Sequence, residues 1–216
     1  MKRFSNLGSD SFAAFQIIWA YVFTVPQLFR MFVSTTGMTI NWLLCALIFI
    51  VLNLILSISS YRKVNNRKTA QAIVIYANWV LLLIPLVTVA FIKCPWTGRD
   101  SVIFSLIMAA ALSIGLWCAI SKTSLTDPVV KGLFVGLFRA VPHLFMAYCI
   151  FSAGSSRGIA FVTMIAANVT ALCRVTTLLM SCRETHWEKG IRASFLSECA
   201  NEGSWMVTSV MWLVYR

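Results

Sequence analysis

Seven apolar segments, each about as long as a bilayer is thick, make up most of this 216-residue chain. A helix needs roughly 20 mainly apolar residues to cross the hydrocarbon core of a membrane. With 59% apolar and 12% charged residues, the chain has too few charges to cover a water-exposed surface. We therefore expect an all-α integral membrane protein with seven transmembrane helices. These are Ser11 to Phe32, Met38 to Ser60, Gln71 to Lys93, Ser101 to Ile120, Val129 to Phe151, Gly158 to Ser181 and about Phe195 to Tyr215.

A short motif occurs twice, as Val-Pro26-Gln27-Leu-Phe in the first segment and as Val-Pro142-His143-Leu-Phe in the fifth, 116 positions later. In each copy a polar turn and a second apolar segment follow. Internal repeats are typical of transporter folds, whose substrate sites lie at the repeat interface near the bilayer midplane. We expect one three-helix repeat at 8–95 and another at 128–216. A linker helix at 100–122 would bring the two repeats into parallel orientation.

The Pro26-Gln27 dipeptide, the Ser34-Thr-Thr-Gly37 turn and the 3+1+3 arrangement resemble the PQ-loop superfamily. This superfamily includes the SWEET sugar transporters and the cystinosin-like amino-acid exporters. The resemblance implies a seven-helix transporter in which Pro26 and Pro142 act as hinges between inward-open and outward-open states. The hinge sites comprise the dipeptides Pro26-Gln27 and Pro142-His143. His143 stands where the family usually has glutamine.

A hinge at these prolines is also physically reasonable, because proline removes a helical hydrogen bond and disrupts the preceding turn. The alternative is that proline is simply commoner in transmembrane helices than in soluble ones.

SWEET-type transporters bind substrate through asparagines on the third and seventh helices, with neighbouring tryptophans. The resemblance therefore points to Asn78 with Trp79, and to Asn201 with Trp205, as substrate-binding residues. Asparagines between membrane helices also form interhelical hydrogen bonds, and tryptophans often mark the membrane interface. Both interpretations remain open at the level of sequence.

Two arginines, Arg139 and Arg174, lie within the predicted spans at about the same depth. Charges inside a membrane are costly and usually functional, and guanidinium groups suit a carboxylate or phosphate. The alternative is that each arginine is neutralised within the protein by Glu198 or Glu202. Because Arg174 and Glu202 lie at similar depths on neighbouring helices, we expect these two to form an ion pair.

Lysine and arginine are unequally divided between the two sides of the predicted bundle, with eleven on the side of the N-terminus and five on the other. An excess of basic residues marks the cytoplasmic side. The N-terminus is therefore predicted to be cytoplasmic, opposite to the orientation of SWEET proteins. The net charge of +11 is loop charge of this kind and does not indicate nucleic-acid binding.

Catalysis and metal binding have little support in the sequence. The seven cysteines are scattered without a CxxC pair, and only two histidines are present. No enzyme activity, cofactor or metal site is predicted. His143 could carry protons in a coupled transporter or form a structural hydrogen bond.

The sequence favours a membrane transporter of a small polar solute, such as a sugar, amino acid, vitamin or related metabolite. The alternative is a membrane receptor or adaptor on the same scaffold. Its expected partners are the solute and membrane lipids, and a homo-oligomer is left open.

Overall fold

The computed structural model describes residues 2–184 and 186–216, with side chains for all of these except 2–12, Lys68, Ala171, Arg174, Thr177, Ser181, Glu184 and Lys189. Every regular element in the described residues is a helix. The elements are α1 (Lys2–Val33), α2 (Ile40–Val64), α3 (Arg67–Lys93), α4 (Gly98–Ser121), α5 (Pro128–Val135), the π-helical segment η1 (Gly136–Ala140), α6 (Val141–Ala153), α7 (Phe161–Glu184) and α8 (Lys189–Val214). The prediction of an all-α chain is confirmed for this part of the protein.

Four helical stretches are long and apolar enough to cross a membrane: Ile40–Val64, Thr69–Lys93, Gly98–Ser121 and Pro128–Ala153. The last of these contains α5, η1 and α6, which follow one another without interruption. The described part of α7 contributes a shorter apolar stretch, Phe161–Thr170. These helices fit a multi-pass membrane protein. The number of seven spans and their arrangement as two repeats stay predictions.

Most helices extend beyond the apolar segments that predicted them, because polar capping residues lie outside those segments. The side chain of Asn66 accepts a hydrogen bond from the backbone N–H of Thr69, so α3 begins several residues before Gln71. Thr97 and Asp100 form a capping box at the start of α4. Caps of this kind satisfy backbone groups that the first turn of a helix leaves unpaired.

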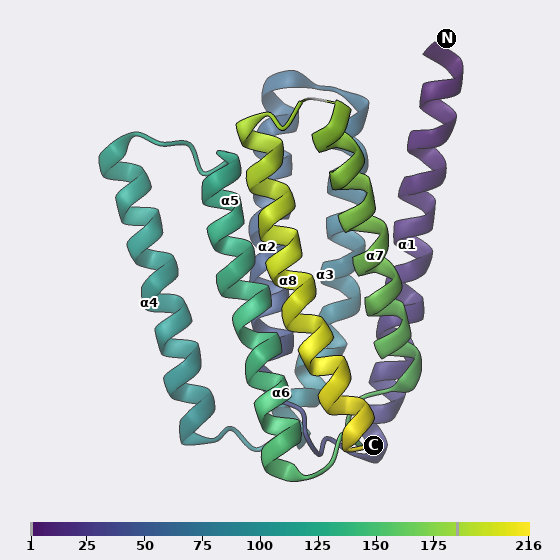
Figure 1. The fold of residues 1–216 in the computed structure, drawn as a ribbon, viewed down its shortest axis with the longest axis vertical. Coiled ribbons are helices and arrows are strands. Elements are labelled where there is room, and N and C mark those ends of the chain that lie inside the picture. Colours follow the sequence, from purple (N-terminus) through teal and green to yellow (C-terminus); the bar gives the residue numbers. More distant parts are fainter. Residues whose placement is uncertain (1, 185) are drawn as a thin grey trace.

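The helices stand side by side and alternate in direction, so that the two chain ends lie at opposite ends of the bundle (Figure 1). We call the end with the N-terminus the N-side; it carries the α2–α3, α4–α5 and α7–α8 turns. The opposite end, the C-side, carries the α1–α2, α3–α4 and α6–α7 turns and the C-terminus (Figure 1).

Packing divides the bundle into two groups of helices. In the first group α3 packs against both α1 and α2, and in the second α8 packs against α7 and against the α5–α6 stretch. The groups meet where α1 contacts α7 and where α2 contacts η1 and α6. Helix α4 stands at one edge, where it contacts α2 and η1 (Figure 1).

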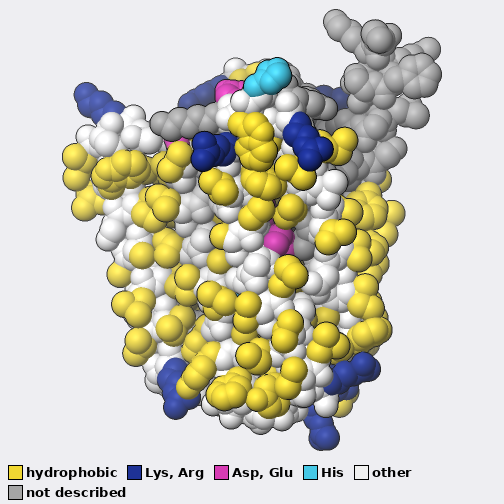
Figure 2. All heavy atoms as spheres, viewed as in Figure 1, with side chains coloured by type: hydrophobic (Ala, Val, Ile, Leu, Met, Phe, Trp, Pro, Cys, Tyr) yellow, Lys and Arg dark blue, Asp and Glu magenta, His cyan; other side chains and the backbone are white. Residues whose placement is uncertain are grey.

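The outer surface is largely apolar. Ile92, Leu112 and Ile120 are 76%, 70% and 75% exposed. A wide band of hydrophobic side chains separates the Lys and Arg side chains at the two ends (Figure 2). A surface of this kind is stable against lipid and would aggregate in water.

Candidate functional site

A cavity of about 600 Å³ lies between the two groups of helices. It extends from Pro128 and Lys131, near the N-side, to His143 and Trp205. His143 lies about 22 Å along the stretch that begins at Pro128, by the rise of 1.5 Å per residue. The cavity therefore reaches about the middle of the bundle from the N-side.

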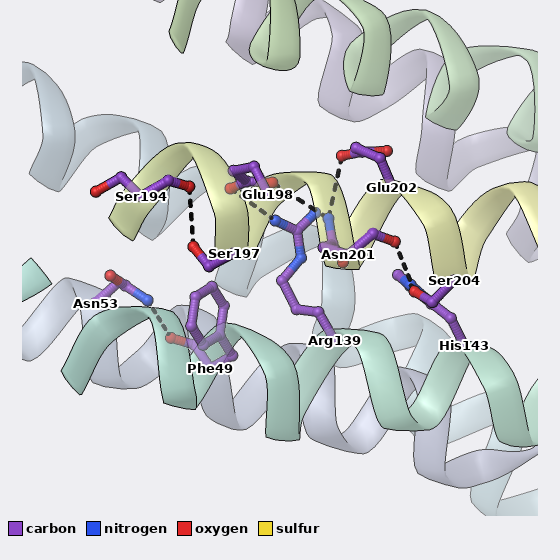
Figure 3. A network of polar contacts seen from close by, with 10 residues as sticks. All are labelled: Phe49, Asn53, Arg139, His143, Ser194, Ser197, Glu198, Asn201, Glu202 and Ser204. Atoms are coloured by element: carbon purple, nitrogen blue, oxygen red, sulfur yellow. Dashed lines mark hydrogen bonds and ion pairs between the residues drawn. The ribbon is translucent and has the colours of Figure 1, made fainter. Parts of the chain in front are cut away.

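The cavity wall contains an ion pair between two helical elements of the second group, η1 and α8. The Nη1 atom of Arg139, on η1, lies 3.5 Å from the Oε1 atom of Glu198, on α8 (Figure 3). The guanidinium group of Arg139 also lies over the ring of Phe49, 6.0 Å from its centroid. The side chains of Arg139 and Glu198 are 24% and 17% exposed, so the pair is partly accessible from the cavity.

Asn201 connects the two glutamates of α8. Its Nδ2 atom donates hydrogen bonds to Oε2 of Glu198 at 3.3 Å and to Oε1 of Glu202 at 3.1 Å (Figure 3). This arrangement determines which way the amide is oriented, because an amide oxygen would be repelled by both carboxylates. The Oδ1 atom of Asn201 is buried and has no hydrogen-bond partner among the described residues.

Aromatic rings line the cavity at its deep end. The rings of Trp42 and Trp205 are stacked with centroids 5.9 Å apart, and Phe23 lies edge-on to both Trp42 and Trp79. The ring of His143 is 4.5 Å from that of Trp205. The indole N–H of Trp205 is buried without an acceptor in the described part of the chain, although buried indole groups usually find one.

His143 is held by α8. Its Nδ1 atom lies 3.4 Å from the hydroxyl of Ser204, and its backbone carbonyl accepts a hydrogen bond from Thr208 Oγ1 at 2.8 Å. These contacts correspond to the structural hydrogen bond that was one of the two interpretations of His143.

The second proline motif lies directly after the π-helical segment. Pro142 has no backbone N–H, and its ring would press on the carbonyl group of Phe138 in a regular α-helix. The N–H of Val141 instead donates to the carbonyl of Gly136, five residues earlier. π-helical turns of this kind are frequent at functional sites. Arg139 belongs to this segment, and its side chain extends toward α8 (Figure 3).

The first proline motif closes the bundle on the C-side. Gln27 is completely buried; its Nε2 atom donates to the carbonyl of Gly158 at 2.8 Å, and its Oε1 atom accepts from the N–H of Ala160 at 3.0 Å. The N–H of Gly158 donates in turn to the carbonyl of Thr36 at 2.8 Å. The α1–α2 and α6–α7 turns are thus joined by backbone contacts.

Two glycines allow these turns to meet. Gly37 has a φ of +79°, and a Cβ atom at this position would collide with the carbonyl oxygen of Ser155. A Cβ atom on Gly158 would lie only 2.8 Å from the carbonyl oxygen of Thr36. Any larger side chain at either position would force the turns apart.

Asp100 adds a third connection on the C-side. Its Oδ1 atom accepts a hydrogen bond from the hydroxyl of Thr39 at 2.6 Å, and its backbone carbonyl accepts from Nδ2 of Asn41 at 2.9 Å. The α1–α2 turn is thereby tied to the start of α4. A second cavity, of about 740 Å³, lies beside these residues and shares no described lining residue with the first.

Several residues proposed from the sequence line the first cavity: Trp79, Arg139, His143, Asn201 and Trp205. Asn78 is not among its described lining residues, although its Nδ2 atom is buried and no described residue pairs with it. Of the four proposed hinge residues, His143 lines the cavity, whereas Pro26, Gln27 and Pro142 are not among its described lining residues.

One sequence prediction falls outside the described residues. The side chain of Arg174 is not described, so its predicted ion pair with Glu202 stays a prediction. Glu202 itself is buried, 9% exposed, and lines the cavity. Arg139 forms an ion pair with Glu198. Its binding of a substrate anion stays a prediction.

Sequence reasoning missed Trp42 and the role of Asp100. The dipeptide Asn41-Trp42 repeats the pair Asn78-Trp79 and could have drawn attention to Trp42. The spacing of Thr97 and Asp100 is that of a capping box and marks the start of a helix. No sequence signal identifies the further bond from Thr39 to Asp100.

No protein-family model matches the sequence, and no curated protein or solved structure matches it either. Among the described residues, no group of three His, Cys, Asp or Glu side chains could hold a metal ion.

Proposed function

We propose that this protein is a membrane transporter that moves a small polar solute by alternating access. The two moving units would be α1–α3 and α5–α8, with α4 as the linker. The observation that carries this proposal is the cavity between the two helix groups, which reaches mid-depth from one side only. Charged groups line its wall, indole rings lie at its deep end, and turns closed by Gln27 lie beyond it.

The packing of the two helix groups supports this proposal. In each group the third helix packs against the other two. The first helix of the first group, α1, contacts the second helix of the second group, α7. Likewise, the second helix of the first group, α2, contacts the first helical stretch of the second group through η1 and α6. Such reciprocal contacts are expected of two repeats related by an axis along the membrane normal.

The conformation has the features of one end state of an alternating-access cycle. If the excess of basic residues marks the cytoplasm, the N-side is cytoplasmic and the cavity opens inward. Pro26 and Pro142 lie in helices that line the interface between the groups, where a hinge would act. Movement to the other end state would separate the α1–α2 turn from the α6–α7 turn.

A solute panel and a liposome assay test this proposal together. Sugars, amino acids, nucleosides and vitamins are screened for an increase in the thermal midpoint of the purified protein, because a bound ligand stabilises the folded state by mass action. Solutes that bind are then measured for flux into liposomes containing the protein. We expect flux of at least one of them. Binding without flux would contradict transport and favour the receptor function.

A further inference from the structure

We propose that the solute is a zwitterion, an α-amino acid with an apolar side chain, held between Arg139 and the carboxylates of α8. This inference rests on the proposed transport function and names the class of substrate. The carboxylate of the solute would lie against Arg139 and the indole N–H of Trp205. Its ammonium group would lie against Glu198, Glu202 and the Oδ1 atom of Asn201.

The first argument is the geometry of the ion pair. Arg139 and Glu198 lie 3.5 Å apart, whereas a charge-assisted hydrogen bond between such groups is normally about 2.7 to 2.9 Å long. Both side chains are partly accessible from the cavity and come from different helical stretches. A zwitterion can enter between these two side chains and offer each of them a group of opposite charge, without changing the net charge of the site.

Solutes of other charge fit the pair less well. A simple anion bound to Arg139 would lie close to the like charge of Glu198. A simple cation bound to Glu198 would lie close to the like charge of Arg139. A neutral sugar can hydrogen-bond to both side chains, but it carries no charge to balance that of either one. The opposite charges on facing helices therefore favour a solute that carries both.

The second argument comes from two buried polar atoms that have no partner among the residues whose side chains are described. Asn201 and Trp205 are 1% and 3% exposed and lie four residues apart on α8, on the same face of the helix. The Oδ1 atom of Asn201 is an unused acceptor beside the two carboxylates, and the Nε1 group of Trp205 is an unused donor. The Oδ1 atom of Asn201 can therefore accept from the ammonium group of the solute, as Glu198 does. The N–H of Trp205 can donate to its carboxylate, as Arg139 does.

The aromatic residues determine what surrounds the rest of the solute. Phe23, Trp42 and Trp79 line the cavity beside Trp205 and offer an apolar surface for a side chain. A volume of about 600 Å³ lies within the range of about 300 to 1,000 Å³ that is usual for small-molecule sites. An amino acid with an apolar side chain matches both features.

The test compares matched ligands on the purified protein. The thermal midpoint is measured with leucine and phenylalanine, with their amides, which lack the carboxylate, and with their N-acetyl derivatives, which lack the ammonium group. Glucose serves as a neutral solute. We expect at least one of the two free amino acids to raise the midpoint, and its blocked forms and glucose to leave it unchanged. Equal stabilisation by blocked and free forms, or none by either amino acid, would overturn the proposal.

A variant measures the contribution of the ion pair. The double substitution Arg139→Gln and Glu198→Gln removes both charges and keeps two side chains that can hydrogen-bond to each other. Arg157→Gln, which removes an exposed charge on the C-side, is the matched control. We expect the half-saturating amino-acid concentration to rise by at least about tenfold in the double variant and not in the control. An unchanged value in the double variant would contradict the proposal.

The two proposals can fail separately. Binding of a free amino acid without flux into liposomes would contradict transport and leave recognition of a zwitterion in place. Flux of glucose or of a blocked amino acid, without binding of the free form, would support transport and contradict recognition of a zwitterion.

Discussion

Gln27 offers the sharpest test of how the C-side is closed. Its amide group pairs with two backbone groups of the α6–α7 turn, the carbonyl of Gly158 and the N–H of Ala160. The substitution Gln27→Leu keeps a side chain of similar size but removes the amide, so that both backbone groups lose their hydrogen-bond partner. Gln27 is 0% exposed, so water cannot easily replace the lost hydrogen bonds.

The expected cost follows from the two stranded groups. A buried donor or acceptor without a partner costs about 1 to 3 kcal/mol, so the closed C-side should be destabilised by at least about 2 kcal/mol. An opened turn exposes both groups to water and avoids this cost. Since about 1.4 kcal/mol corresponds to a factor of ten, the opened population should rise by roughly thirtyfold or more.

Amide hydrogen exchange measures this opening directly. Peptides covering 155–161 are followed by mass spectrometry, because the Ala160 N–H donates to Gln27 and exchanges only when the turn opens. We expect exchange there to be roughly thirtyfold faster in Gln27→Leu. The control is Thr88→Val, which removes an exposed hydroxyl bonded to the carbonyl of Ile84 in its own helix. Unchanged exchange at 155–161 in Gln27→Leu would refute the reasoning.

Three further predictions concern the C-side network, the hinges and the topology. Asp100→Asn should lower the thermal midpoint, because an asparagine has one acceptor oxygen for the donors of Thr39 and Thr97. The donor left without a partner costs about 1 to 3 kcal/mol. A midpoint equal to that of the unsubstituted protein would contradict this prediction. Pro26→Ala and Pro142→Ala should each slow flux into liposomes more than they weaken ligand-induced stabilisation, because a hinge acts on the interconversion of states; equal loss of both would mean that the prolines shape the cavity. In cysteine labelling of intact cells, a cysteine at Asn65 should be protected and one placed after Arg216 should react, as the charge distribution predicts; the reverse pattern would match the orientation of SWEET proteins.

The positions of the helices could be predicted from the sequence, because the length and apolarity of a segment are local properties. The second segment was expected from Met38 and begins at Ile40, and the third was expected to end at Lys93, as it does. The ends that differ are those where polar residues extend a helix. Helix α8 begins at Lys189, before the apolar part expected from about Phe195.

Part of the candidate site was also predictable. The cost of a charge inside an apolar span identified Arg139, whereas Asn201 and Trp205 were identified through the resemblance to SWEET-type transporters. Which side chain meets Arg139 was not predictable, since Glu198 and Glu202 are both close in depth. The choice of Glu198 depends on how the α5–α6 stretch packs against α8, and on the π-helical turn that carries Arg139.

The sequence by itself determined that Gln27, inside an apolar helix, needs hydrogen-bond partners, because a buried amide without them is costly. Only the tertiary structure decided that these partners are backbone groups 131 and 133 positions away. The same holds for Gly37 and Gly158, whose missing side chains matter because two distant turns meet there. Local chemistry sets what each residue requires, whereas long-range packing determines which of many distant groups meets the requirement.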